Sequence, residues 1–210
     1  VLAEDRLRAA VRVLDFGPDE AAELLALRGA AKERAWWNQP MLIDVVQQLY
    51  GLEDGAERIR AFEGVVVSGL LQTPSYARAL IEASPFHRPA DTDRLVETRL
   101  RRQERLLAEP PVHLQVVLGQ ATLLQQVREP EVLLDQLRHL VDVAERHHDT
   151  IEIRVLPFAH PMGGMTGAGT VCLLDLPRLP TAVAYQEALV EATITTAADT
   201  VRFLEICYEQ

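Results

Sequence analysis

The chain has 210 residues, of which 48% are hydrophobic, and is long enough to bury the core of one large domain. Its formal net charge of −10 makes it a poor DNA binder, because duplex DNA is held by Lys and Arg side chains that neutralise phosphates. No apolar run approaches the roughly 18 to 20 residues of a membrane span, and the charged N-terminus is unlike a signal peptide. We therefore expect a cytoplasmic protein that does not enter a membrane.

Two helices are predicted near the N-terminus. Residues 3–14 place apolar side chains on one helical face, and Pro18 begins a second helix that runs to about Arg34. Trp36 and Trp37 then mark a junction. The sequence therefore predicts a helical appendage and a larger domain, with bounds 1–38 and 39–210.

The larger domain alternates predicted helices and strands. Its first helix spans 41–60, since apolar residues recur there at helical spacing, and an interruption near Gly51 or Gly55 is left open. Five short segments rich in β-branched or apolar residues are predicted strands: 62–67, 112–118, 151–156, 170–176 and 182–186. Further helices are predicted at 75–83, 91–108, 120–128, 130–147 and 195–208. This order predicts an α+β fold, with a central, mostly antiparallel sheet of about five strands flanked by helices and an N-terminal helical appendage.

The run VVVSGLLQTPSY at 65–76 predicts an apolar strand that breaks at Gly69 and passes into a helix. Ser and Thr at such a turn cap free N–H groups, and an exposed helix start can also bind an anion. Ser68 and Gln72 are therefore candidate ligand-binding residues. Arg102, on the predicted helix 91–108, is another, because a guanidinium that enters a pocket can hold a carboxylate or phosphate; the alternative is a surface ion pair.

The segment HPMGGMTGAG at 160–169 contains four glycines between two predicted strands. Such a loop is either a plain hairpin or a flap that closes over a ligand, with methionines as adaptable apolar contacts. His160, Met162, Met165 and, on the following strand, Glu187 are the remaining candidate binding residues. The glycine spacing matches neither a Rossmann nor a Walker motif.

The sequence gives less support for a catalytic site or a metal site than for a ligand-binding site. Ser68, Thr170 or Cys172 could act as a nucleophile with His160 as base, but these residue types are common and the motif spacing is undefined. The six histidines form no HExxH or HxxxH pattern, and the two cysteines form no CxxC pair. We expect no metal and no cofactor, and leave the catalytic residues undefined.

Several motifs resemble the DUF5753 domain, which is found mainly in actinobacterial proteins behind an XRE-type helix-turn-helix. They are SGLLQTPSYARA at 68–79, RLRRQERLL at 99–107, EPEVLLDQLRHLVDVAE at 129–145 and IEIRVLPFAHPMGG at 151–164. Residues before 38 resemble the last helix and connector of the DNA-binding domain, without its recognition helix. Either the chain is trimmed from a longer regulator, or this member has lost DNA binding. Ser68 replaces the usual Pro, and Gly119 and Gln120 stand where an acidic residue is common.

The resemblance implies an effector-sensing and dimerisation domain of an XRE-like transcriptional regulator, which would bind a small molecule or a small cognate protein. DNA would be contacted only through a helix-turn-helix that is incomplete in this chain, and a homodimer is possible. The alternative is a stand-alone enzyme of specialised metabolism that holds a mainly apolar substrate in the same pocket.

Overall fold

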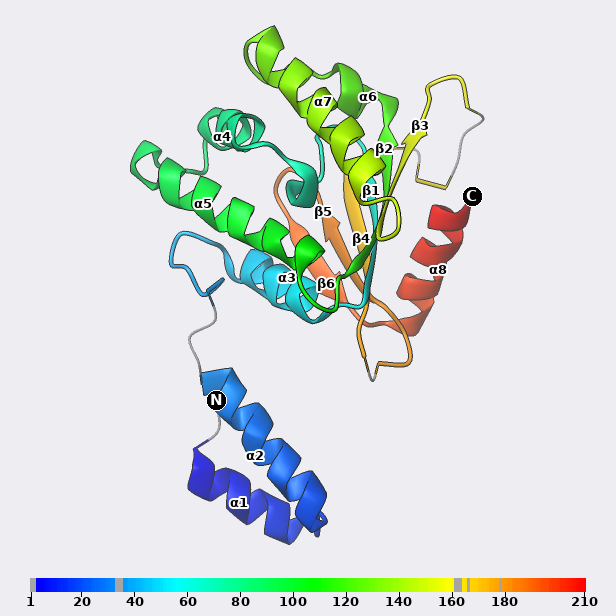
Figure 1. Cartoon of the computed structure of the whole chain (residues 1–210). Helices are drawn as coiled ribbons and strands as arrows, with labels where there is room; N and C mark the ends of the chain where they lie inside the picture. The colour runs from blue at the N-terminus through cyan, green and yellow to red at the C-terminus, as the bar shows by residue number, and fades with distance from the viewer. Residues whose placement is uncertain (1–2, 33–35, 161–163, 166, 178) are drawn as a thin grey trace. The chain divides into compact units, whose positions relative to one another are not determined.

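The computed structural model describes residues 3–32, 36–160, 164, 165, 167–177 and 179–210. The chain divides into two compact units, Val1–Pro40 and Met41–Gln210. The first unit contains helices α1 (Glu4–Val13) and α2 (Pro18–Lys32), which are joined by an ion pair of 3.1 Å between Arg28 and Glu4 (Figure 1). None of the described helices is both long and apolar enough to cross a membrane.

The second unit is built on a six-stranded mixed sheet with the order β3-β2-β1-β4-β5-β6. Strands β1, β2 and β3 run parallel to one another, whereas β1, β4, β5 and β6 form antiparallel pairs. The strands are β1 (Arg58–Glu63), β2 (His113–Gly119), β3 (Ile151–Leu156), β4 (Thr170–Asp175), β5 (Val183–Glu187) and β6 (Ala192–Thr195). The predicted α+β class is confirmed, with one strand more than the five expected.

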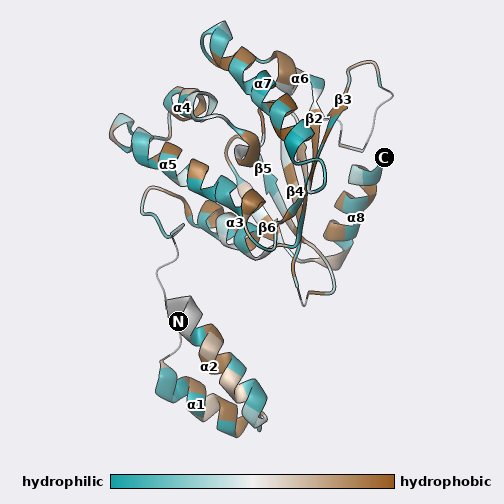
Figure 2. Cartoon of the chain, in the orientation of Figure 1, coloured by the Kyte–Doolittle hydropathy of each residue, from teal (hydrophilic) through white to brown (hydrophobic). Residues whose placement is uncertain are grey.

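Helices cover both faces of this sheet. Helix α8 (Ala198–Glu209) lies on one face, and the other helices of the second unit lie on the opposite face, which we call the helical face (Figure 1). The helical face carries α3 (Asp44–Gly55), α4 (Pro74–Ala83), α5 (Thr92–Gln103), α6 (Gln120–Leu124) and α7 (Pro130–Arg146). Hydrophobic and hydrophilic residues are mixed along α5 and α7, as expected for helices with one buried side (Figure 2).

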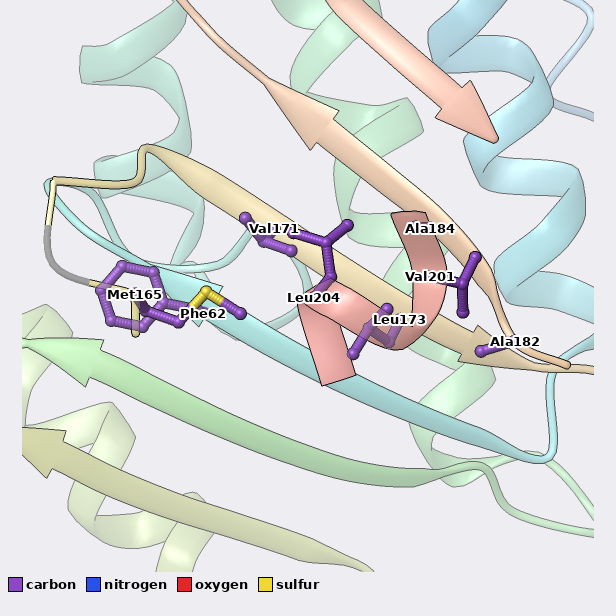
Figure 3. Close-up of a cluster of buried hydrophobic side chains, with 8 residues drawn as sticks. All are labelled: Phe62, Met165, Val171, Leu173, Ala182, Ala184, Val201 and Leu204. Carbon is purple, nitrogen blue, oxygen red and sulfur yellow. The ribbon is translucent and has the colours of Figure 1, made fainter. Parts of the chain in front are cut away.

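Alternation along the central strand β1 assigns its side chains to the two faces. Phe62 points toward α8, where it belongs to a core cluster with Leu204 (Figure 3). The other members of this cluster are Met165, Val171, Leu173, Ala182, Ala184 and Val201. Glu63, the next residue along β1, therefore points toward the helical face.

Two predicted boundaries around β1 are wrong. The helical spacing of apolar residues suggested one helix over 41–60, but α3 ends at Gly55 and β1 begins at Arg58. Glycine destabilises the interior of a helix, which favours an end of α3 at Gly55. Within β1, Arg60 is held on the α8 face by ion pairs with Asp175 at 3.1 Å and Glu205 at 2.8 Å. Residues 65–67 then lie beyond the strand, and a short 3-10 helix spans Gly69–Leu71.

The C-terminal prediction also needs correction. A helix was expected over 195–208, whereas α8 begins at Ala198 and the preceding residues form the edge strand β6. The Thr195 hydroxyl accepts a hydrogen bond of 3.1 Å from the backbone N–H of Ala197, which stabilises the turn between the two elements.

Candidate functional site

A buried carboxyl group lies at the end of the central strand. Glu63 is the last residue of β1, and its side chain is only 4% exposed. The hydroxyl of Thr170 donates to Oε2 of Glu63 over 2.7 Å, and the hydroxyl of Ser68 donates to the same carboxyl group. Gly64 follows, where a Cβ would collide with the backbone carbonyl of Ala168. Two hydroxyls and a close backbone approach therefore fix this carboxyl in the sheet.

The buried position changes the acidity of Glu63. Burial raises its pKa to about 7, and this effect exceeds the opposing effects of the two hydroxyls and of the positive charge of Arg102. The carboxyl group consequently titrates close to neutral pH. A titrating carboxyl is a feature of many catalytic sites, although burial alone also produces it.

A second buried acid, Glu53 of α3, forms an ion pair with Arg102 of α5. Nε and Nη2 of Arg102 each donate to one oxygen of the Glu53 carboxylate. The guanidinium also lies over the ring of Tyr50, 4.8 Å from its centroid. At Gly69 a Cβ would collide with Nη1 of Arg102, so glycine is required there for space. This arrangement locks α3, α5 and the 3-10 turn together.

The opposite charges of Arg102 and Glu53 stabilise each other. Burial lowers the pKa of Arg102, but the Glu53 carboxylate more than compensates, so the net shift is upward. For Glu53, burial raises the pKa while Arg102 opposes the change. A buried pair of this kind depends on both members, because removal of either leaves an uncompensated charge.

Side-chain amides hold the segment between β1 and α4. Gln103 donates from Nε2 to the backbone carbonyl of Gly69 over 3.0 Å. Gln136, fully buried on α7, donates to the carbonyl of Leu71 over 2.7 Å and accepts from the N–H of Thr73 over 2.8 Å. The turn predicted as a candidate anion site is therefore occupied by protein contacts.

A pocket of about 390 Å³ opens beside this network. Its lining residues come from α3 and the segment before it, the end of α4 and the loop after it, α5, and the β5–β6 hairpin. Most are apolar: Met41, Leu42, Ile43, Val46, Ile81, Phe86, Leu95, Ala188, Leu189, Val190 and Ala192. A few polar groups among apolar walls are typical of a small-molecule site.

Four of the lining side chains are large, apolar and exposed. They are Ile43, Phe86, Leu189 and Val190, with exposed fractions of 65%, 74%, 87% and 90%. Single exposed apolar residues are common, but a group of them that lines one pocket indicates a surface that binds a ligand or another protein.

Three polar side chains of the pocket differ in their charge. Arg99 of α5 donates from Nη1 to Oε1 of Gln72 over 2.9 Å. Burial, assisted by the positive charge of Arg99, lowers the pKa of His87. Glu187 is exposed and accepts a hydrogen bond of 2.7 Å from the hydroxyl of Tyr185. A second exposed carboxylate, that of Glu191, also lines the pocket. The pocket thus offers a cation, a neutral imidazole and two carboxylates.

Four of the seven predicted binding residues lie on the helical face. Ser68, Gln72 and Arg102 are buried and bonded to other protein groups, with 3%, 2% and 8% exposure. Gln72 supports the pocket indirectly through Arg99. Glu187 lines the pocket.

The glycine-rich segment contributes to a different part of the domain. Met165 is buried in the cluster on the α8 face, beside Phe62 (Figure 3). A Cβ at Gly164 would collide with the backbone of Cys207 in α8. His160 is exposed in the turn after β3, and Met162 lies outside the described residues. The predicted residues therefore do not assemble into one site.

The suggested nucleophiles are placed around Glu63. Ser68 and Thr170 both donate to its carboxyl group. Burial, together with the charge of Glu63, raises the pKa of the Cys172 thiol well above its ordinary value, which disfavours the reactive thiolate. Across the described residues, no three His, Cys, Asp or Glu side chains are grouped in a way that could hold a metal ion.

A family model described as a domain of unknown function, DUF5753, matches residues 46–210. The chain belongs to the DUF5753 family. The resemblance inferred from the sequence motifs is thereby confirmed. No curated protein and no solved structure matches the chain.

The DUF5753 match begins inside α3, so the pocket residues Met41, Leu42 and Ile43 precede it. Sequence reasoning missed the two buried acids of the DUF5753 domain, Glu63 and Glu53. A signal for Glu53 exists, since it continues the apolar stripe of Leu49 at helical spacing and an acid in that position needs a buried partner.

Proposed function

We propose that this chain is the effector-binding part of an XRE-like transcriptional regulator and acts in the cytoplasm. A small molecule with a mainly apolar body binds the pocket between α3, α5 and the β5–β6 hairpin. The DUF5753 match and the resemblance of residues before 38 to an XRE connector support the regulator context. The pocket is the observation that carries the proposal.

The size and lining of the pocket suit a small molecule. Its volume of about 390 Å³ falls in the range of roughly 300–1,000 Å³ that is usual for ligand sites. Apolar side chains from the β5–β6 hairpin, including Leu189 and Val190, can be withdrawn from water when a ligand binds. Burial of this surface supplies a driving force for binding.

Chain connectivity links the pocket to the N-terminal unit. Met41, Leu42 and Ile43 line the pocket and are the first residues of the second unit, directly after the Trp36–Trp37 junction. A ligand that contacts these residues favours one conformation of the connector over others. Regulation then requires different affinities of the ligand for the two conformations, because equal affinities shift no equilibrium.

The two tryptophans of the chain provide a built-in reporter. Trp36 and Trp37 pack edge to face in the connector, with ring centroids 5.4 Å apart, and the sequence contains no other tryptophan. Titration with phenylbutanol and phenylbutyrate, two soluble molecules with the same apolar body, is expected to change tryptophan emission in a saturable way. The physical reason is that occupancy of the pocket orders Met41 and Ile43 and thereby alters the junction.

A matched pair of variants locates the effect. Val46→Phe fills the pocket and should abolish the emission change, whereas Val141→Phe adds the same ring at an exposed site on α7 and should preserve it. Emission that responds to neither compound, or that still responds in Val46→Phe, would contradict the proposed function.

An enzymatic role is the second candidate, and the observation that favours it is Glu63. A carboxyl group with a pKa of about 7 beside the hydroxyls of Ser68 and Thr170 could act as a general acid or base near neutral pH. Both hydroxyls are hydrogen-bonded to the Glu63 carboxyl group, so a substrate would have to displace at least one of them. Turnover of a bound compound that is lost in Ser68→Ala would favour this candidate over a sensor.

A further inference from the structure

Arg99 is held in the pocket by neutral groups. It lies one turn after Leu95 on α5, and both residues line the pocket. Its Nη1 donates to Oε1 of Gln72 over 2.9 Å, and Nε2 of Gln72 donates to the backbone carbonyl of Val67 over 2.6 Å. Since Gln72 is only 2% exposed, this amide fixes the guanidinium in place without neutralising its charge.

Other arginines of the second unit differ from Arg99 in this respect. Arg102 is paired with Glu53, Arg60 with Asp175 and Glu205, and Arg78 with Asp93. In the part of the chain that the structure describes, no carboxylate oxygen lies within 4.0 Å of the Arg99 guanidinium. The charge of Arg99 acts on the buried Glu53 carboxyl group from beyond this distance, but Glu53 forms its ion pair with Arg102. The half-buried guanidinium of Arg99 can therefore still bind a ligand.

The positive charge of Arg99 also acts on another residue that lines the pocket. His87 also lines it, and the pKa of His87 is lowered first by burial and then by Arg99. The neutral imidazole can still donate or accept one hydrogen bond. A ligand oxyanion beside Arg99 would thus meet a permanent cation and a second polar group, in a site whose walls are mostly apolar.

On the proposal that this pocket binds a small molecule, we propose further that its ligand is an organic anion, a carboxylate or similar oxyanion attached to an apolar body. The oxyanion binds the guanidinium of Arg99, and the apolar body lies toward Leu189 and Val190. Glu187 and Glu191 enforce this orientation, because their exposed carboxylates lie on the hairpin side and repel an anion placed there.

The test compares three compounds that share one apolar body: phenylbutyrate, phenylbutanol and phenylbutylamine. Affinities are measured by isothermal titration calorimetry on the full chain. We expect phenylbutyrate to bind about tenfold or more tightly than the alcohol, with the amine weakest. Arg99→Gln should remove the preference for the acid. Arg99→Lys should retain part of it, because charge remains but the planar pair of donors is lost.

Arg94→Gln is the matched control, since Arg94 is an exposed residue of the same helix and does not line the pocket. It should leave all three affinities unchanged. Equal affinities for acid and alcohol, both abolished by Val46→Phe, would overturn the anion inference while the pocket proposal survives. Preference for the amine would assign recognition to the carboxylates of Glu187 and Glu191 and would also overturn the anion inference. Failure of all three compounds to bind would contradict both proposals.

Discussion

Replacement of Arg102 by methionine is expected to lower the free energy of unfolding by about 3–5 kcal/mol, because the Glu53 carboxylate is then buried without a partner. For a chain of this length, such a loss corresponds to a melting temperature lower by about 6–20 °C. Urea unfolding followed by circular dichroism measures the effect. A cost below about 1 kcal/mol would show that the pair does not hold α3 and α5 together.

Two further variants separate the ion pair from the size of the side chain. Arg94→Met changes an exposed arginine of the same helix and should alter the free energy of unfolding by no more than about 0.5 kcal/mol. Combination of Arg102→Met with Glu53→Gln should recover a large part of the loss, since the uncompensated charge is removed. A double variant as unstable as Arg102→Met alone would attribute the loss to packing against Tyr50.

Replacement of Glu63 by glutamine is expected to change how stability depends on pH. The pKa of Glu63 is about 7 in the folded chain and has an ordinary value of 4.5. Between these values the folded state retains a proton that the unfolded state has lost, so this group makes stability fall as pH rises from 4.5 to about 7. The loss is complete above pH 7 and amounts to about 3 kcal/mol.

The measurement is the free energy of unfolding of the unaltered chain and of Glu63→Gln at pH 5 and pH 8. The variant should gain about 2.5 kcal/mol relative to the unaltered chain over this interval, on top of a constant difference from altered hydrogen bonds. Other titrating groups contribute equally to the pH dependence of both proteins, so their contributions cancel in the comparison. One of them is Glu53, whose pKa is also raised by burial. Parallel pH profiles would contradict the assignment, and Glu97→Gln, at an exposed site on α5, should give such parallel profiles.

The local sequence pattern was sufficient to predict an element whose apolar residues recur regularly along its whole length. Strand β3 was predicted with its observed bounds, because Ile151, Ile153 and Val155 alternate with charged residues. Helix α7 was also close to its prediction, since Pro130 begins it and its apolar stripe is continuous. The short strand β6 was missed because four residues are too few to show a clear alternating pattern.

The candidate site depends on contacts that no local pattern contains. The pocket is assembled from segments around Val46, Leu95 and Leu189, which are far apart in the chain. For Arg102 the sequence left open a ligand in a pocket or a surface ion pair; the residue instead forms a buried ion pair with an acid on another helix, and only tertiary structure shows that pairing. Arg99, which shares a helical face with Arg102, is the arginine that reaches the pocket.

Hydrogen–deuterium exchange with phenylbutyrate tests most directly the claim that this pocket is the ligand site of the domain. The account predicts slower amide exchange in the segments that line it, 41–50, 84–88 and 187–192, at saturating compound. It predicts no change in α8 or in β3, which lie outside the pocket. Protection confined to α8 and the strands beneath it, with 41–50 and 187–192 unaffected, would contradict the account.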